Sequence, residues 1–188
     1  MLHRTFLAAA IAEHTRRALA AVAESLDSGG AKVRFTAPGN LHVTLNFLGD
    51  VADDVLRRVC DAAVEAAAGI APFEFSVCGL VPAPPRTHLR MIWANVQDPT
   101  GALGGLQEKL AASLETLGFP RENRPYRPHL TVARIKHIPD DRRIRAEIER
   151  LSEESFGAQQ ATEVTVFTSE LTPSGPIYTP AGHAALAG

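Results

Sequence analysis

Apolar residues recur at helical spacing in four segments of this chain. Val59, Ala63 and Ala67 lie four positions apart on one side of the segment 53–68, and Gly69 follows it as an end signal. The remaining segments show similar stripes, with the charged residues on the opposite side. The spacing predicts helices over residues 13–27, 53–68, 100–117 and 140–152.

Stretches with strand-like patterns fill much of the chain between these helices. Phe73, Phe75 and Val77 alternate with polar or small residues, which is typical of a strand with one buried face. Pairs of strands between single helices favour an α+β fold with largely antiparallel sheets over a doubly wound parallel sheet. The strands are expected over residues 2–9, 32–36, 41–48, 73–80, 88–96, 129–135, 162–171 and 175–180.

Two His-x-Thr tripeptides begin at His42 and at His129, inside two of the predicted strands. Each has an apolar residue after the histidine and another after the threonine. Side chains alternate between the faces of a strand, so each histidine shares a face with Thr44 or Thr131. Two such matched copies are rare in a random sequence, and we interpret them as an internal duplication. If the copies face each other, two imidazoles surround one small volume.

A pair of imidazoles suits an in-line displacement at phosphorus, with one accepting a proton from water and the other donating a proton to the leaving oxygen. Thr44 and Thr131 are candidates to bind the non-bridging phosphate oxygens, and Arg134 could add a charge-assisted hydrogen bond. This chemistry requires no metal ion or cofactor. A two-histidine metal site is an alternative, but it lacks a clear third ligand, because Asp50 is the one acidic residue that follows His42 closely.

Composition narrows the choice of ligand. The 188 residues and 45% hydrophobic content fit one domain or two small lobes with a common core. A net charge of −2 argues against a protein that coats long duplexes. Positive side chains nevertheless gather around the second tripeptide, which favours a small, highly charged anion. They are Arg121, Arg124, Arg127, Arg134 and Lys136, against Glu122.

The two cysteines are too few for a disulfide framework, and we expect a reducing cytoplasm. The first twelve residues have some features of a signal peptide, but their apolar run is short, and a strand followed by a helix is the favoured interpretation. No segment approaches the roughly 20 apolar residues that span a bilayer. His3, His14, His88, His137 and His183 have no partner motif and are expected to be surface or structural residues.

Two loops are predicted to form walls of the site. They cover residues 81–87 and 119–128, contain prolines and carry arginines. Phe47, Trp93 and Tyr126 are candidates to stack on a nucleobase. Core packing is the stronger expectation for Phe47 and Trp93.

The segments around both tripeptides resemble those of the 2H phosphoesterase superfamily, and within it the bacterial RNA 2′,3′-cyclic phosphodiesterases, first described as 2′-5′ RNA ligases of the LigT type. Residues 40–49, Asn-Leu-His-Val-Thr-Leu-Asn-Phe-Leu-Gly, resemble the first family motif, and residues 127–134, Arg-Pro-His-Leu-Thr-Val-Ala-Arg, the second. The similarity is nearly full length. One departure is Asn46, where the family usually has lysine.

The resemblance implies one domain over residues 1–188, made of two pseudo-symmetric lobes with one motif each around a central cleft. It implies metal-independent hydrolysis of 2′,3′-cyclic phosphates at RNA or nucleotide ends to 2′-phosphates. His42 is then the proton donor and His129 the proton acceptor. Tyr126 and Arg127 are possible substrate contacts. The expected partners are RNA ends or nucleotides with a 2′,3′-cyclic phosphate, and tRNA is a candidate. The protein is expected to be a cytoplasmic monomer that binds no membrane.

Several alternatives remain open at this level. The residues alone do not assign acid and base, because the two motifs are nearly symmetric. Related activities use the same histidines: 2′-5′ RNA ligation, hydrolysis of 2′-5′ oligonucleotides, or opening of ADP-ribose cyclic phosphate. A nucleotide- or RNA-binding module without catalysis is a further alternative, and the two matched imidazoles argue against it.

Overall fold

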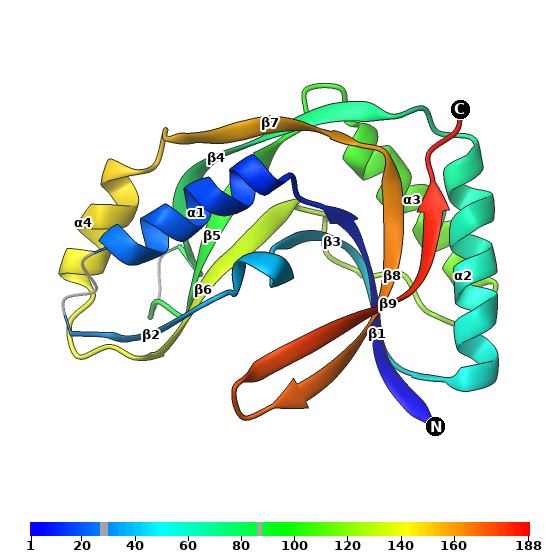
Figure 1. Ribbon diagram of the computed structural model, residues 1–188, viewed down its shortest axis with the longest axis horizontal. Helices are drawn as coiled ribbons and strands as arrows, with labels where there is room; N and C mark the ends of the chain where they lie inside the picture. The colour runs from blue at the N-terminus through cyan, green and yellow to red at the C-terminus, as the bar shows by residue number, and fades with distance from the viewer. Residues whose placement is uncertain (27–29, 86–87) are drawn as a thin grey trace.

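The computed structural model describes residues 1–26, 30–85 and 88–188. Within these ranges the chain forms two antiparallel sheets with helices packed against them (Figure 1), which confirms the predicted α+β fold. The helices are α1 (Glu13–Ser25), α2 (Asp53–Ala68), α3 (Ala102–Glu115) and α4 (Arg142–Arg150), with a 3-10 turn at Pro38–Asn40. The strands are β1 (Leu2–Ala10), β2 (Lys32–Phe35), β3 (His42–Ala52), β4 (Phe73–Ala83), β5 (Met91–Gln97), β6 (His129–His137), β7 (Ser155–Ala161), β8 (Glu163–Thr172) and β9 (Gly175–Ala185).

The first sheet has the strand order β3-β1-β8-β9. Its inner strand β1 contains Leu7, Ala8 and Ala9 in succession, all without exposed surface, so this strand is covered on both faces. Helix α2 packs on β8 and β9, and α3 packs on α2 and β3 (Figure 1). Burial of these small and aliphatic side chains provides hydrophobic stabilisation of the first sheet.

The second sheet has the order β2-β6-β5-β4-β7, with α1 against β7 and α4 against β4. The sequence pattern does not predict β7, whose segment Ser-Phe-Gly-Ala-Gln-Gln-Ala contains few residues that favour strands. The strand forms because it pairs antiparallel with β4 and buries Phe156 and Ala161. Tertiary pairing therefore determines the conformation of this segment.

The two motif strands come from different sheets and lie near each other. β3 is an edge strand of the first sheet, β6 is the second strand of the other, and the two are in contact (Figure 1). Neither sheet is a continuous piece of sequence, because β8 and β9 return to the first sheet and β2 joins the second. This crossing brings His42 and His129 to one interface.

The β8–β9 hairpin extends away from helices α2 and α3 (Figure 1). At its tip the Thr172 hydroxyl donates a hydrogen bond to the Gly175 carbonyl oxygen, 2.6 Å away. The Asn40 amide donates to the Pro176 carbonyl oxygen at 2.9 Å. The first contact closes the tip of the hairpin, and the second holds the hairpin against the turn that precedes β3.

Several predicted boundaries differ from the observed ones. β3, β4 and β9 each continue at least three residues past the predicted end, and β5 begins at Met91 rather than at residue 88. Residues 81–83 of the predicted first loop belong to β4. Residues 86–87 of that loop and residue 27 of the first predicted helix lie outside the described residues.

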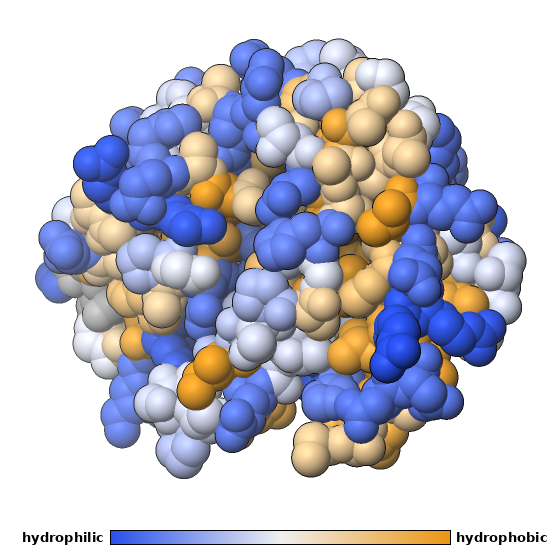
Figure 2. All heavy atoms as spheres, turned by 45° about the vertical axis from the view of Figure 1, so that its right-hand side comes forward, coloured by the Kyte–Doolittle hydropathy of each residue, from blue (hydrophilic) through white to orange (hydrophobic). Residues whose placement is uncertain are grey.

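Hydrophobic and hydrophilic side chains are interspersed on the face shown in Figure 2, where orange groups are separated by blue ones. Apolar residues at the surface are common in folded proteins, and only large continuous patches need an explanation. In the described ranges, none of the helices combines the length and hydropathy that crossing a membrane would demand.

Candidate active site

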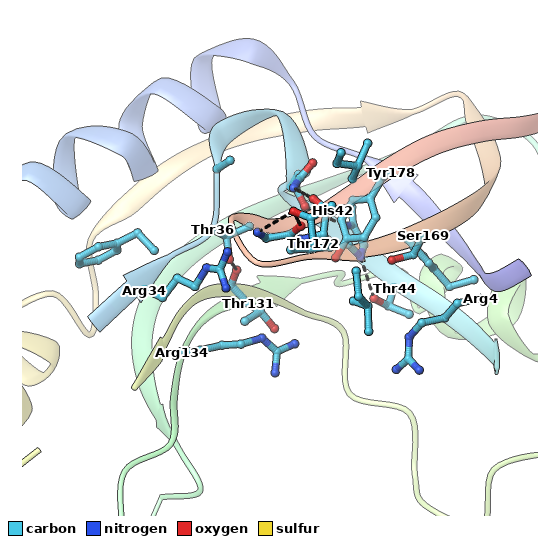
Figure 3. Close-up of a pocket in the computed structure, with 18 of the residues that line it drawn as sticks. Arg4, Arg34, Thr36, His42, Thr44, Thr131, Arg134, Ser169, Thr172 and Tyr178 are labelled. Atoms are coloured by element: carbon cyan, nitrogen blue, oxygen red, sulfur yellow. Dashed lines mark hydrogen bonds between the residues drawn. The ribbon is translucent and has the colours of Figure 1, made fainter. Parts of the chain in front are cut away.

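A cavity of about 670 Å³ contains both His-x-Thr motifs. Strands of both sheets and the β8–β9 hairpin form its walls (Figure 3). The lining includes all five residues that the sequence predicts to act on phosphate: His42, Thr44, His129, Thr131 and Arg134. The other lining residues are Arg4, Phe6, Arg34, Phe35, Thr36, Ala37, Asn40, Phe47, Ser169, Leu171, Thr172, Ser174, Gly175, Pro176, Ile177 and Tyr178.

His42 is the first residue of β3, directly after the 3-10 turn. Its Nδ1 lies 2.8 Å from the carbonyl oxygen of Asn40. A carbonyl oxygen only accepts, so Nδ1 carries the proton, and Nε2 of the neutral ring is left with a lone pair. The Thr44 hydroxyl lies 3.1 Å from Nε2 and can donate to it. The backbone thus selects the tautomer that exposes Nε2 for proton transfer.

His129 repeats this arrangement at the start of β6. Its Nδ1 lies 2.8 Å from the carbonyl oxygen of Arg127, again two residues earlier in the chain. The same argument assigns the proton to Nδ1 and the lone pair to Nε2. Both histidines are therefore oriented by main-chain carbonyls that belong to the segment entering each motif strand.

Aromatic rings from the neighbouring strands hold the imidazoles in place. Phe6 of β1 stacks on His42 with 4.7 Å between ring centroids, and Tyr178 of β9 meets the same imidazole edge-on at 5.4 Å. Trp93 of β5 stacks on His129 at 3.8 Å. Stacked rings restrict the motion of the imidazoles and keep their orientation fixed.

The protonation of His42 responds to its surroundings. Burial lowers the pKa of this imidazole, and the charge of a protonated His129 lowers it further, while the hydrogen bond to Asn40 acts in the opposite direction. Two nearby imidazoles therefore resist simultaneous protonation, as expected for groups that act as one acid and one base.

Positive charge dominates the cavity wall. Arg4, Arg34 and Arg134 all line it, and among the described residues no Asp or Glu belongs to the lining. The phenol of Tyr178 has a pKa raised by burial, and the charges of Arg134 and Arg4 partly offset this effect. A pocket of this composition favours an anionic ligand over a cation.

Arg4 and Arg34 were not selected from the sequence. They lie on β1 and β2, and neither belongs to a motif segment. The pairing of β2 with β6 places Arg34 opposite Arg134, so a correct strand pairing would have identified Arg34. No sequence pattern near Arg4 indicates that this residue lines the cavity.

Neither predicted loop lines the cavity in its described residues. In the second loop, the Tyr126 hydroxyl donates to the Thr44 carbonyl oxygen at 3.1 Å, and burial raises the pKa of this phenol. Arg127 contributes its carbonyl oxygen to His129, and its side chain is not part of the wall. The expectation that residues 119–128 form a site wall is therefore wrong, and so is the same expectation for residues 81–85 of the first loop. Substrate contacts of Tyr126 and Arg127 stay predictions.

A β-bulge changes which side chains of β3 face the cavity. Thr44 pairs with Ala8 and Asn46 with Leu7, so Leu45 has no partner in β1. The insertion shifts the alternation, and Phe47 rather than Asn46 joins the cavity wall. Phe47 is 45% exposed, which makes the expectation of core packing wrong for this residue.

Asn46 occupies the position where the family resemblance leads one to expect lysine. It does not line the cavity, and its Oδ1 is buried without a hydrogen-bond partner in the described residues. The wall formed by the three arginines therefore does not include Asn46.

Comparison with known proteins identifies the family. The family of LigT-like phosphoesterases matches residues 10–93 and, a second time, residues 95–178, so each match contains one His-x-Thr motif. The chain belongs to this family. Among its LigT-like relatives, the RNA 2′,3′-cyclic phosphodiesterase of Methanothermobacter thermautotrophicus is 37% identical, over 94% of this chain and 95% of the relative. The RNA 2′,3′-cyclic phosphodiesterase of Methanocaldococcus jannaschii is 30% identical, over 93% of this chain and 96% of the relative.

Solved structures of LigT-like proteins share the fold. A protein from Thermus thermophilus superposes with a TM-score of 0.83 at 28% identity, over 98% of both chains. Escherichia coli LigT complexed with 3′-AMP gives a TM-score of 0.79 at 22% identity, over the full length of both chains. The similarity to Escherichia coli LigT establishes that the two proteins share a fold.

Proposed function

We propose that this LigT-like phosphoesterase hydrolyses 2′,3′-cyclic phosphates at RNA or nucleotide ends to 2′-phosphates, without a metal ion. The observation that carries the proposal is the pair of imidazoles, each with Nδ1 bonded to a carbonyl, in a cavity whose described lining has three arginines and no carboxylate. The relatives named RNA 2′,3′-cyclic phosphodiesterase support the choice of substrate.

The proposed reaction is a single in-line displacement. His129 Nε2 takes a proton from water while the water oxygen forms a bond to phosphorus. The bond between phosphorus and the 3′ oxygen breaks, and His42 donates a proton from Nε2 to that oxygen. The product carries a 2′-phosphate and a free 3′-hydroxyl, and the two histidines have exchanged protonation states.

The polar residues of the wall stabilise the transition state in this proposal. Thr44 and Thr131 donate hydrogen bonds to the non-bridging oxygens, on which negative charge grows. Arg134 adds a charge-assisted hydrogen bond to the same group. The Thr44 hydroxyl lies 3.1 Å from His42 Nε2. Once this nitrogen is protonated for the donor role it no longer accepts a hydrogen bond, so the hydroxyl hydrogen can turn to the phosphate.

The assignment of His42 as donor follows the family resemblance and requires a protonated ring in the complex. Burial lowers the pKa of His42 in the free protein. A bound phosphate brings a negative charge next to the imidazole and raises its pKa. Substrate binding therefore favours the protonated form that the donor role needs.

Among the described residues, no three His, Cys, Asp or Glu side chains come together as a candidate metal site. Metal-independent chemistry stays part of the proposal and is tested directly below. Action on tRNA, a monomeric state and a cytoplasmic location likewise remain predictions from the sequence.

The test is hydrolysis of cytidine 2′,3′-cyclic phosphate in excess EDTA, with the 2′- and 3′-phosphate products separated by chromatography. The proposal expects the 2′-isomer at a rate that EDTA does not change. A His42→Ala/His129→Ala double variant serves as the control for contaminating nucleases. Loss of activity in EDTA that is restored by a divalent cation, or formation of the 3′-isomer, would contradict the mechanism.

A further inference from the structure

Each motif strand has a β-bulge directly after its threonine. In β3, Leu45 follows Thr44 and has no register partner in β1. In β6, Val132 follows Thr131 and has no register partner in β5. A bulge disrupts the ladder of main-chain hydrogen bonds around the extra residue. The main-chain carbonyl groups of both threonines therefore lie beside an interruption in the strand pairing, where side chains can serve as hydrogen-bond donors.

A side-chain hydroxyl donates to each of these two carbonyl oxygens, and in both cases it belongs to the segment that enters the other motif. Tyr126 lies in the segment that leads to the second motif, and its hydroxyl donates to the Thr44 carbonyl oxygen at 3.1 Å. Thr36 lies between β2 and the 3-10 turn that leads to the first motif. Its hydroxyl donates to the Thr131 carbonyl oxygen at 2.7 Å, and Figure 3 shows both threonines at the pocket. The two contacts are therefore reciprocal.

We propose that Tyr126 and Thr36 are positioning residues, whose two hydrogen bonds form a cross-brace that fixes the His-x-Thr motifs relative to each other. The inference rests on the proposed function. In an in-line displacement the attacking water and the leaving oxygen lie on opposite sides of phosphorus, so the base and the acid must be held at a set separation and orientation. The cross-brace supplies this constraint through the main chain of both motifs.

The segments that carry the cross-brace also orient the imidazoles. The Asn40 carbonyl oxygen lies 2.8 Å from Nδ1 of the first motif histidine, and the Arg127 carbonyl oxygen lies at the same distance from Nδ1 of the second. Thr36 precedes Asn40 by four residues, and Tyr126 comes directly before Arg127. A shift of either segment therefore moves the imidazole that it orients and also pulls on the threonine of the other motif.

Both hydroxyl groups are well placed as donors. Burial, with a smaller effect from the charge of Asp98, raises the pKa of the Tyr126 phenol, so the phenol keeps its proton. The Tyr126 ring packs against the hydrophobic core. The Thr36 hydroxyl donates at a typical O–H···O distance, and the Thr36 main-chain N–H donates to the Val132 carbonyl oxygen at 2.8 Å. Thr36 thus holds both Thr131 and the bulge residue that follows it.

The experiment measures kcat and KM separately for cytidine 2′,3′-cyclic phosphate. Tyr126→Phe and Thr36→Val each remove one hydroxyl of the cross-brace, and each should lower kcat by roughly 5- to 100-fold. The lower value corresponds to the loss of one hydrogen bond, and the upper to a displacement of about 1 Å between reacting groups. KM should stay nearly constant, because the arginines of the wall still bind the phosphate. Thr36→Ser keeps the hydroxyl and should retain most of the wild-type kcat.

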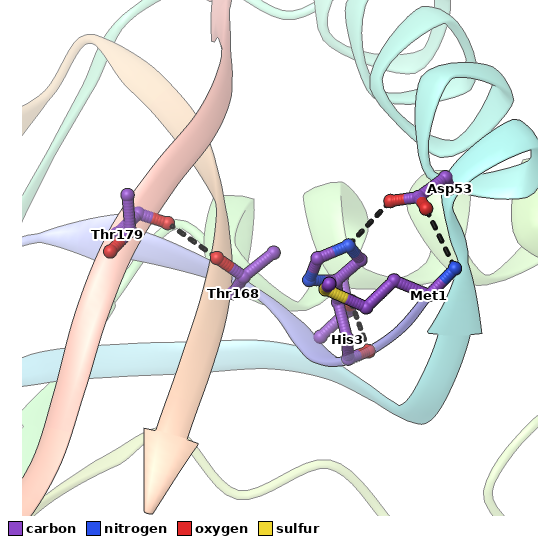
Figure 4. Close-up of polar contacts among 6 residues, drawn as sticks. Met1, His3, Asp53, Thr168 and Thr179 are labelled. Carbon is purple, nitrogen blue, oxygen red and sulfur yellow. Dashed lines mark hydrogen bonds and ion pairs between the residues drawn. The ribbon is translucent and has the colours of Figure 1, made fainter.

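Thr168→Val is the matched control. The Thr168 hydroxyl on β8 donates to the Thr179 carbonyl oxygen on β9 at 3.3 Å (Figure 4), and Thr168 does not line the cavity. This substitution removes the same kind of hydrogen bond away from the motifs and should leave kcat and KM unchanged. Thermal unfolding followed by circular dichroism establishes that each variant is folded. Tyr126→Phe keeps the whole ring and provides the test should Thr36→Val not fold.

The outcomes distinguish this inference from the proposed function. Absence of turnover by folded wild-type protein contradicts the proposed function and, with it, the cross-brace. Wild-type turnover with kcat unchanged in folded Tyr126→Phe or folded Thr36→Val overturns the cross-brace alone. A raised KM at constant kcat also overturns it, because the hydroxyls would then bind substrate. Equal losses of kcat in Thr36→Ser and Thr36→Val overturn it as well, since the size of the side chain would then be responsible.

Discussion

The two His-x-Thr motifs have the same local geometry but different surroundings. His42 and His129 each begin a strand, and each donates from Nδ1 to the carbonyl oxygen two residues earlier, at 2.8 Å in both cases. Around His42, however, Phe6 and Tyr178 pack against the imidazole, and burial lowers its pKa. Trp93 is the ring stacked on His129.

This difference shows how a repeated motif can supply two different catalytic groups. The repeat provides two imidazoles with the same tautomer and orientation. The neighbouring strands differ between the two sheets and provide unequal environments, and burial lowers the pKa of His42. A reaction that needs one donor and one acceptor requires both features. The following experiments test whether the two halves differ in function as they do in environment.

Replacement of either histidine should have the largest effect. His42→Ala and His129→Ala are each expected to lower kcat by about 100- to 10,000-fold, the usual contribution of a general acid or base. Thermal unfolding monitored by circular dichroism should show that both variants remain folded, because both side chains lie at the cavity wall. A single variant with more than a tenth of the wild-type rate would exclude the two-histidine mechanism.

A substrate with a good leaving group sharpens this comparison between the halves. A p-nitrophenyl phosphodiester releases a stable anion that needs no proton, so loss of the donor matters little. His42→Ala should therefore lose much less activity on this substrate than His129→Ala. The reverse pattern would exchange the assigned roles of the two histidines.

The threonines should give the next largest effect. Thr44→Ala and Thr131→Ala each remove one hydroxyl near the phosphate, with an expected cost of about 1–3 kcal/mol in transition-state stabilisation. The loss should be larger for Thr44, whose hydroxyl also contacts His42 Nε2. Steady-state kinetics measures both. Unchanged rates in both variants would assign the stabilisation of the oxyanion to the arginines instead.

Sequence patterns predicted the parts of this site that depend on local alternation. His42 shares a strand face with Thr44, and both line the cavity, as do His129 and Thr131. The α+β fold also followed from the order of the segments. These features depend on residues that are close in sequence, so the spacing of side chains along a helix or strand is enough to predict them.

The features that were missed depend on contacts between distant segments. The bulge at Leu45 has no local signal, yet it turns Phe47 toward the cavity and away from the core. Arg4 reaches the site through the pairing of β1 with β3, and β7 forms through its pairing with β4. Periodicity cannot give strand register or bulges, because both are set by the partner strand.

The stacked tryptophan should have a smaller effect than the threonines. Trp93→Leu removes the ring that lies 3.8 Å from the His129 imidazole, and kcat should fall by roughly 2- to 12-fold, in line with the energy of one aromatic pair. Trp93→Phe keeps a stacking ring and should recover most of the rate. Equal losses in both variants would indicate that the size of Trp93, rather than its stacking on His129, matters.

The smallest expected change is a shift in the pH profile, and it bears most directly on the difference between the two halves. If His42 is the donor, kcat/KM requires its protonated form and falls as pH rises through its pKa. Burial holds the pKa of His42 below the usual histidine value of about 6.5. In the free enzyme, kcat/KM should therefore begin to fall with rising pH below that value, which defines the alkaline limb of the profile. Phe6→Leu admits water beside the imidazole, which should raise the pKa of His42 and move the limb to higher pH by less than about one unit.

NMR titration of the ring protons gives the pKa of His42 in the same variant. Phe167→Leu is the matched control, because its ring lies 6.4 Å from His42 and should influence the pKa less than Phe6. If the acidic limb moves in Phe6→Leu while the alkaline limb stays in place, His42 acts in its neutral form. Its buried environment would then serve to keep a base unprotonated, and His129 would be the donor.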